Sequence, residues 1–145
     1  MKAILALLMS FFLIGEPSAG STPHPLPPGD WLETSEAAFE LAGKSQKLVL
    51  LDFTFDTCGW CHKMDADAYP DPKVQELLKS FHIVKVNRDK RPDLVKRFST
   101  DMQLTHLAYP CRIYLDGNGV EVDRAQGYKK APEFLEELGA IVAVG

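Results

Sequence analysis

Residues 47–55, KLVLLDFTF, form a nearly continuous run of apolar residues that is rich in strand-forming types. Such a run is typical of a strand that is covered on both faces of its sheet, because a half-exposed strand carries polar residues at every second position. A strand of this kind has to be packed between other elements. It therefore indicates a layered fold with helices beside a sheet and argues against a helical bundle.

The spacing of apolar residues elsewhere predicts the remaining elements. Pro70 ends one helix, and Asp71 followed by Pro72 is typical of the start of the next. The order of helices and strands predicts an α/β three-layer sandwich, with a mixed central sheet, a final hairpin and helices on both faces. The predicted helices cover residues 35–46, 58–69, 72–81, 92–98 and 132–142, and the predicted strands cover residues 47–55, 82–87 and a hairpin within 111–125.

The overall composition is that of one globular domain. The chain has 145 residues, of which 46% are hydrophobic and 25% are charged, with a formal net charge of -4. This usage is close to that of ordinary globular proteins. Because no cluster of Lys and Arg is present, nucleic acid is not expected as a partner.

The first residues are typical of a secretory signal peptide. Lys2 precedes an apolar run over residues 3–14, and small residues follow at 18–20. This layout predicts cleavage near Ala19 or Gly20, with residues 1–20 as the signal peptide. An uncleaved N-terminal anchor is the alternative, although the run is shorter than the ~20 residues of a spanning helix.

The next segment is a proline-rich linker. Residues 21–30, STPHPLPPGD, contain four prolines, so we expect an extended linker there and a folded domain over residues 31–145. If the domain is exported to the periplasm or beyond, its disulfides can persist.

The stretch Cys58-Gly59-Trp60-Cys61-His62 has two interpretations. A C-x-x-C pair beside alternating strands and helices is typical of a thioredoxin-like redox site, whereas C-x-x-C-H is also the haem attachment motif of c-type cytochromes. The α/β pattern favours the redox interpretation, since small c-type cytochromes are helical. A zinc site made by both cysteines, His62 and Cys111 is less favoured, because a second closely spaced ligand pair is missing.

The position of the pair suits thiol-disulfide exchange. Cys58 follows the buried strand and begins a helix, where free N–H groups and the helix dipole lower the pKa of a thiol. Cys61 lies one turn later and faces inward. We therefore expect Cys58 to attack a substrate disulfide and Cys61 to resolve the mixed disulfide.

Asp52 interrupts the apolar strand. A carboxylate buried in a central strand is unfavourable unless it has partners, so Asp52 is a candidate for proton transfer to or from the resolving cysteine. The alternative is that Asp52 lies at the rim of the sheet and is solvated.

The segments LLDFTFDTCGWCHKM and YPCRIYLDGNG resemble the thioredoxin superfamily from about Trp31 to the C-terminus. Together with DPKVQELLKSF, they are most similar to exported thioredoxin-like proteins and to the C-terminal domain of transmembrane thiol:disulfide interchange proteins. The resemblance implies a thioredoxin fold and dithiol-disulfide exchange with protein substrates. It assigns Asp52 to the buried acid and Pro110 to a cis-proline that faces the cysteines, with Tyr109 presenting its backbone to an extended substrate segment.

Two departures from thioredoxin affect this interpretation. Thr57 replaces the Trp before the first cysteine and Gly59-Trp60 replaces Gly-Pro, so the redox potential cannot be transferred. Gly59 and Trp60 remain candidates for substrate contact. Cys111, directly after Pro110, is either a small buried strand residue or a third redox-active thiol.

The sequence as a whole predicts an exported thiol-disulfide oxidoreductase that acts without a cofactor or a metal. Asp52 and the thioredoxin-like layout favour reduction of protein disulfides, although an oxidase or an isomerase remains open. Reduction outside the cytosol requires an electron donor, for which a membrane thiol:disulfide interchange protein is the expected partner. A monomer is expected. The alternative from another class is a binding or chaperone module with a structural disulfide.

Overall fold

The computed structural model describes residues 25–99 and 108–145, and a five-stranded mixed sheet runs through its centre. The strands follow the order β1-β3-β2-β4-β5 across the sheet. In chain order the elements are β1 (Trp31–Leu32), α1 (Ser35–Ser45), β2 (Leu48–Thr54), α2 (Gly59–Asp67), α3 (Pro72–Leu78), β3 (Phe81–Asn87), α4 (Pro92–Phe98), β4 (Cys111–Leu115), β5 (Glu121–Gln126) and α5 (Ala131–Val144).

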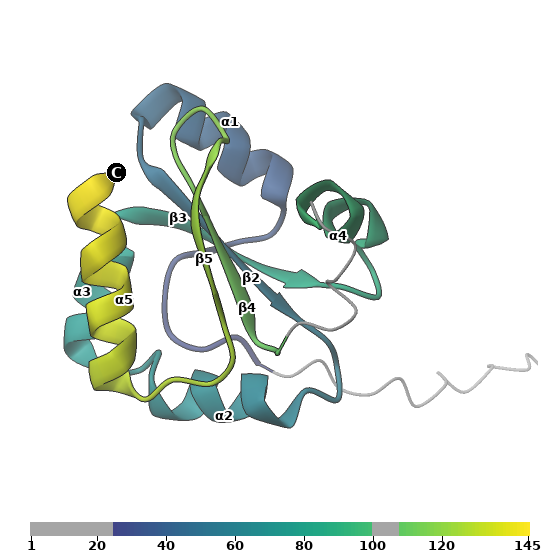
Figure 1. Cartoon of the computed structure of the whole chain (residues 1–145), viewed down its shortest axis with the longest axis vertical. Coiled ribbons are helices and arrows are strands. Elements are labelled where there is room, and N and C mark those ends of the chain that lie inside the picture. The colour runs from purple at the N-terminus through teal and green to yellow at the C-terminus, as the bar shows by residue number, and fades with distance from the viewer. Residues whose placement is uncertain (1–24, 100–107) are drawn as a thin grey trace, which may run out of the picture.

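The strand predicted from the apolar run is the central one. β2 pairs in parallel with β3 on one side and antiparallel with β4 on the other. β1 continues the parallel part beyond β3, and β5 continues the antiparallel part beyond β4. All residues of β2 except the last are buried. The predicted α/β class, the mixed sheet and the final hairpin are confirmed (Figure 1).

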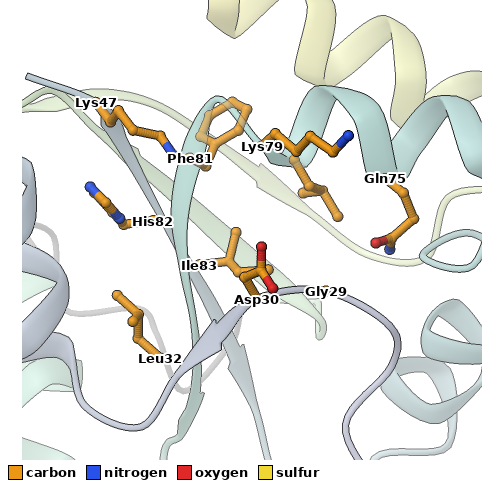
Figure 2. Close-up of a pocket in the computed structure, with 10 residues that line it drawn as sticks. Gly29, Asp30, Leu32, Lys47, Gln75, Lys79, Phe81, His82 and Ile83 are labelled. Atoms are coloured by element: carbon orange, nitrogen blue, oxygen red, sulfur yellow. The ribbon is translucent and has the colours of Figure 1, made fainter. Parts of the chain in front are cut away.

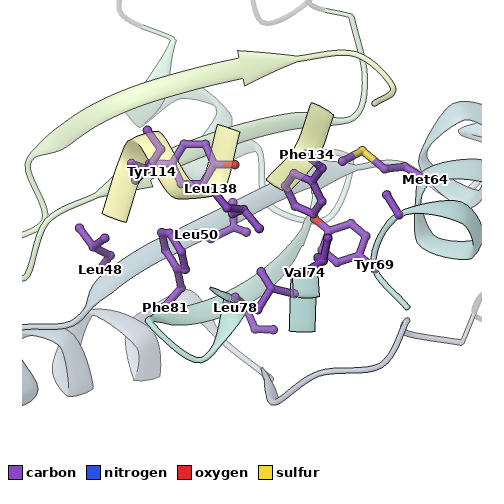
Figure 3. Close-up of a cluster of buried hydrophobic side chains, with 13 residues drawn as sticks. Leu48, Leu50, Met64, Tyr69, Val74, Leu78, Phe81, Tyr114, Phe134 and Leu138 are labelled. Carbon is purple, nitrogen blue, oxygen red and sulfur yellow. The ribbon is translucent and has the colours of Figure 1, made fainter. Parts of the chain in front are cut away.

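Helices cover both faces of the sheet (Figure 1). One core cluster packs α1 and α4 against Leu51 and Phe53 of β2. A second cluster packs α2, α3 and α5 against Leu48 and Leu50 of the same strand (Figure 3). Because side chains alternate along a strand, Asp52 shares the face of Leu50 and lies on the side of the sheet that α2 covers.

The helix starts follow local rules of the sequence. Asp71 Oδ1 accepts hydrogen bonds from the backbone N–H groups of Lys73 and Val74 at 2.8 and 3.2 Å, and Pro72 opens α3. The capping predicted for this helix is therefore confirmed. At α1, Thr34 accepts a hydrogen bond from the N–H of Ala37 at 3.2 Å.

Two elements differ from the sequence prediction. Phe81 was predicted to continue a helix, but α3 ends at Leu78 and Phe81 begins β3. The apolar spacing runs on by chance across the turn between the two elements. The two-residue strand β1 was not predicted, because it is too short to show a period and exists only through pairing with Ile83 and Val84.

The proline-rich segment contacts the domain before β1 begins. Pro27 is buried, and its carbonyl oxygen accepts a hydrogen bond from Trp31 Nε1 at 2.8 Å. The carbonyl of Pro28 accepts a hydrogen bond from Gln75 Nε2 at 2.8 Å. The signal peptide expected over residues 1–20 lies outside the described residues. Within the described ranges, no helix is long and apolar enough to cross a membrane.

Candidate active site

The cysteine pair lies at the junction between β2 and α2. Cys58 is the N-cap of α2, Cys61 lies in its first turn, and the two sulfurs form a disulfide. Cys58 Sγ also accepts a hydrogen bond from the backbone N–H of Cys61 at 3.2 Å. Backbone N–H groups at the start of a helix stabilise a thiolate. The first turn of α2 contains no acidic residue that would counteract this effect.

The segment between the cysteines faces solvent, although the cysteines do not. In the disulfide state Cys58 and Cys61 are only 3% and 1% exposed. Trp60 is 59% exposed, and a Cβ atom added to Gly59 would meet nothing within 4 Å. Gly59 and Trp60 therefore form the exposed surface between two buried sulfurs.

An aromatic contact holds Trp60 beside the cysteine pair. The ring of Trp60 packs against the ring of Tyr128, with 5.5 Å between centroids. The hydroxyl of Tyr128 donates to Asp67 Oδ2 at 2.8 Å, and Lys63 Nζ lies 2.7 Å from the same oxygen. The exposed surface at the start of α2 is thus joined to the loop that precedes α5.

The loop before β4 reaches the same region. The Tyr109–Pro110 peptide bond is cis, and the carbonyl oxygen of Pro110 accepts a hydrogen bond from the N–H of Gly127 at 2.8 Å. The ring of Tyr109 packs edge-on against Phe55 at 5.4 Å between centroids. The backbone carbonyl oxygen of Phe55 accepts a hydrogen bond from the backbone N–H of Cys58 at 3.0 Å. Residues that are far apart in sequence therefore meet beside the disulfide.

Asp52 is fully buried, so the alternative of a solvated carboxylate at the rim of the sheet does not hold. Its Oδ2 atom accepts hydrogen bonds from Tyr69 Oη and Lys85 Nζ, both at 2.6 Å. Lys85 Nζ also lies 2.5 Å from Asp65 Oδ1. The ammonium group stands over the ring of Trp31, 4.9 Å from its centroid. The unfavourable burial of Asp52 is therefore offset by an ammonium and a hydroxyl.

Lys85 and Asp65 were not predicted from the sequence as site residues. Lys85 pairs with Asp52 across two parallel strands, a register that no local pattern in the sequence specifies. Asp65 lies four residues after Cys61, on the same face of α2, and this spacing is the signal that could have found it.

A second buried ion pair fastens β4 to α5. Arg112 is fully buried, and its Nε and Nη2 atoms donate to the carboxylate of Glu137 at 2.6 and 3.0 Å. Burial alone would lower the pKa of Arg112, but the bonds to Glu137 outweigh it and the pKa is raised. Burial acts to raise the pKa of Glu137, and Arg112 holds it below its ordinary value. Arg112 Nη1 also donates to the carbonyl of Gly127 at 3.1 Å, just before Tyr128.

Cys111 lies on the other face of the sheet from Asp52. It is fully buried and packs in the cluster with Phe53 under α1 and α4. Burial raises the pKa of the Cys111 thiol to about 11. These features favour the interpretation of Cys111 as a small core residue over that of a third redox-active thiol.

The arrangement of the described side chains bears on the zinc interpretation. No group of three His, Cys, Asp or Glu side chains within residues 25–99 and 108–145 is arranged to hold a metal ion.

The structure also contains a pocket, which Figure 2 shows with its lining residues. It surrounds the beginning of β3, whereas Cys58 follows the carboxyl end of the parallel strand β2. The pocket is therefore not part of the thiol site. Its lining consists of Gly29, Asp30, Leu32, Lys47, Gln75, Leu78, Lys79, Phe81, His82 and Ile83.

The fold and the disulfide at the start of α2 define a thioredoxin-like protein. A thioredoxin from Thermus thermophilus superimposes with a TM-score of 0.68 at 25% identity, covering 81% of this chain and 89% of that one. The oxidised C-terminal domain of DsbD from Neisseria meningitidis gives a TM-score of 0.58 at 20% identity, covering 77% of this chain and 98% of that one. The resemblance inferred from the sequence is confirmed.

Within this class the chain belongs to the family described as "Thioredox_DsbH: Protein of unknown function, DUF255", whose model matches residues 13–132. Human spermatogenesis-associated protein 20 is 34% identical over 109 residues, which are 73% of this chain. The chain spans only 14% of the length of that protein. The chain therefore combines membership of this family with the thioredoxin fold.

Proposed function

We propose that this protein is an exported thiol-disulfide oxidoreductase that reduces disulfides in protein substrates with Cys58 and Cys61. The observation that carries the proposal is the Cys58–Cys61 disulfide at the start of α2, with the buried Asp52 on the face of the sheet that this helix covers. Export is proposed from the signal-like residues 1–20.

The reaction proceeds in two displacement steps. The Cys58 thiolate attacks one sulfur of a substrate disulfide, forms a mixed disulfide and releases the other sulfur as a thiolate. Cys61 then loses its proton to Asp52 and attacks Cys58 Sγ. The substrate sulfur leaves as a thiolate and takes a proton. Two electrons pass from the dithiol to the substrate, and the Cys58–Cys61 disulfide remains.

Each cycle leaves the protein oxidised, so a second partner must return two electrons. A dithiol protein of the membrane fits this requirement outside the cytosol, where glutathione and thioredoxin do not keep thiols reduced. Gly59, Trp60 and the backbone of Tyr109 and Pro110 form the proposed contact surface for an extended substrate segment.

The test is reduction of insulin disulfides by the reduced protein. Cys58→Ser should abolish turnover, and Cys61→Ser should accumulate mixed disulfides through Cys58, seen by mass spectrometry. Cys111→Ala serves as the matched control and should retain activity. Trapping through Cys61 in Cys58→Ser would reverse the roles of the two cysteines. Client binding that survives loss of both cysteines, without any turnover in the wild type, would instead identify a binding module.

The reduction potential of the pair tests the direction of electron flow. A value near that of thioredoxin, about −270 mV, supports a reductase, whereas a value near about −120 mV supports an oxidant.

A further inference from the structure

Beneath α2, one ammonium group is shared by two buried carboxylates. Lys85 Nζ lies 2.6 Å from Asp52 Oδ2 and 2.5 Å from Asp65 Oδ1. The side chains of Asp52, Asp65 and Lys85 are 0%, 4% and 12% exposed. With all three groups ionised, two carboxylates lie against the same ammonium group, and burial makes two like charges in such proximity unfavourable.

The other charged groups near this cluster, Arg112, Glu137 and Lys129, form a second ionic group of their own, whose spare positive charge lies on the partly exposed Lys129. Arg112 of β4 stands beside Asp52 in register, but its guanidinium is paired with Glu137 of α5. Lys129 and the hydroxyl of Tyr114 also bind Glu137. The remaining titratable neighbours, Tyr69, Cys61 and Cys111, are uncharged at neutral pH: burial raises the pKa values of Tyr69 and Cys111, and Cys61 is in the disulfide.

One oxygen of Asp52 is suited to receive a proton. Among the described residues, Asp52 Oδ1 is buried and has no hydrogen-bond partner, while Oδ2 accepts from both Lys85 and Tyr69. A proton on Oδ1 leaves both of these hydrogen bonds in place. The charge of Lys85 then still has a partner, because Asp65 stays ionised beside it.

We propose that Asp65 is a positioning residue that holds Lys85 and sets the pH at which Asp52 takes up and releases a proton. The inference rests on the proposed function, in which Asp52 accepts the proton of Cys61. Asp65 lies one helical turn after Cys61, so both side chains project from the same face of α2 towards the sheet. Without Asp65, Lys85 would pair with Asp52 alone and favour its ionised form.

The direct test follows the protonation of Asp52 by carbon-13 NMR of its carboxyl group in the disulfide form. Asp65→Asn should move the midpoint of this titration to lower pH by roughly one unit, because a like charge is removed. Lys85→Met should move it to higher pH. Asp67→Asn is the matched control: it removes the same charge from α2, but Asp67 is 40% exposed and pairs with Lys63. An unchanged midpoint in Asp65→Asn, or an equal shift in Asp67→Asn, overturns the proposal.

A conservative variant covers the case in which Asp65→Asn does not fold. Asp65→Glu keeps the negative charge and should leave the midpoint of the Asp52 titration close to that of the wild type. A midpoint about one unit lower, as expected for Asp65→Asn, would contradict the role of charge. The pH profile for resolution of the mixed disulfide should shift with the midpoint. If the wild type exchanges no disulfide at any pH, the proposed function fails, yet the NMR titration still decides the role of Asp65.

Discussion

The three cysteines occupy two different environments. Cys58 and Cys61 stand at the start of a helix, where backbone N–H groups stabilise a thiolate once the disulfide is opened. Cys111 is enclosed by the apolar core of the opposite face, where charge is disfavoured. Proximity in the chain to Pro110 therefore does not make Cys111 reactive, because the alternation of a strand directs its side chain into the core.

Burial of Cys111 makes stability depend on pH in the alkaline range. Its pKa rises from 9.0 to about 11 on folding, so the folded protein keeps a proton that the unfolded chain loses between these values. Stability is full below pH 9 and falls as pH rises to 11. The loss, relative to Cys111→Ala, should reach about 3 kcal/mol.

Urea unfolding of both proteins at several pH values measures this loss. Both should carry Cys58→Ser and Cys61→Ser, which prevents disulfide exchange, and the comparison cancels the contributions of Tyr69 and Tyr114. A constant difference in unfolding free energy from pH 8 to about pH 11 would contradict the buried-thiol interpretation.

Helix α5 is held to the sheet by charge as well as by apolar packing. Phe134 and Leu138 pack in the core, and Glu137 lies between them in sequence and binds Arg112 of β4 (Figure 3). Because Arg112 also binds the carbonyl of Gly127, the same pair fixes the loop that carries Tyr128 to Trp60. The docking of α5 thus supports the surface beside the disulfide.

Removing Glu137 should be strongly destabilising, because Arg112 would remain buried without its counter-charge. We expect Glu137→Ala to lower the unfolding free energy by about 3 to 5 kcal/mol, measured by urea denaturation. The double variant Arg112→Met with Glu137→Leu should recover much of this loss. Glu40→Ala breaks an exposed pair with Lys44 and should change stability little. A double variant less stable than Glu137→Ala would argue against this account.

Sequence patterns located the elements with a clear period but not the pairings between them. The apolar run of β2 and the Asp71-Pro72 start of α3 are local signals, and each was sufficient to locate its element. The position of Asp52 was recognised because a charge in an apolar strand stands out. Its partner Lys85 was not recognised, because the register that places Lys85 of β3 beside Asp52 of β2 is set by packing across the sheet.

The ionic cluster beneath α2 joins parts of the chain that are far apart. Asp52 comes from β2, Lys85 from β3 and Asp65 from α2, and the ring of Trp31 in β1 covers the ammonium of Lys85. Trp31 is itself fixed by the carbonyl of Pro27. The segment before β1 therefore contacts the domain and supports the environment of Asp52.

Truncation tests whether residues before Trp31 belong to the folded unit. A chain that begins at Gly29 lacks the acceptor for Trp31 Nε1 and one acceptor for Gln75 Nε2, together with the buried residue Pro27. Relative to a chain that begins at Leu26, we expect a loss of roughly 1 to 3 kcal/mol in unfolding free energy, since two hydrogen bonds disappear.

The same truncation should also affect the site, because Trp31 would lose its anchor over Lys85. The carboxyl resonance of Asp52 should therefore shift between the two chains. Gln75→Ala in the longer chain is the control, since it removes the bond to Pro28 but leaves the bond between Trp31 and Pro27. It should reduce stability without moving the Asp52 resonance. Equal stability of the two chains would show that the folded unit begins at Trp31 after all.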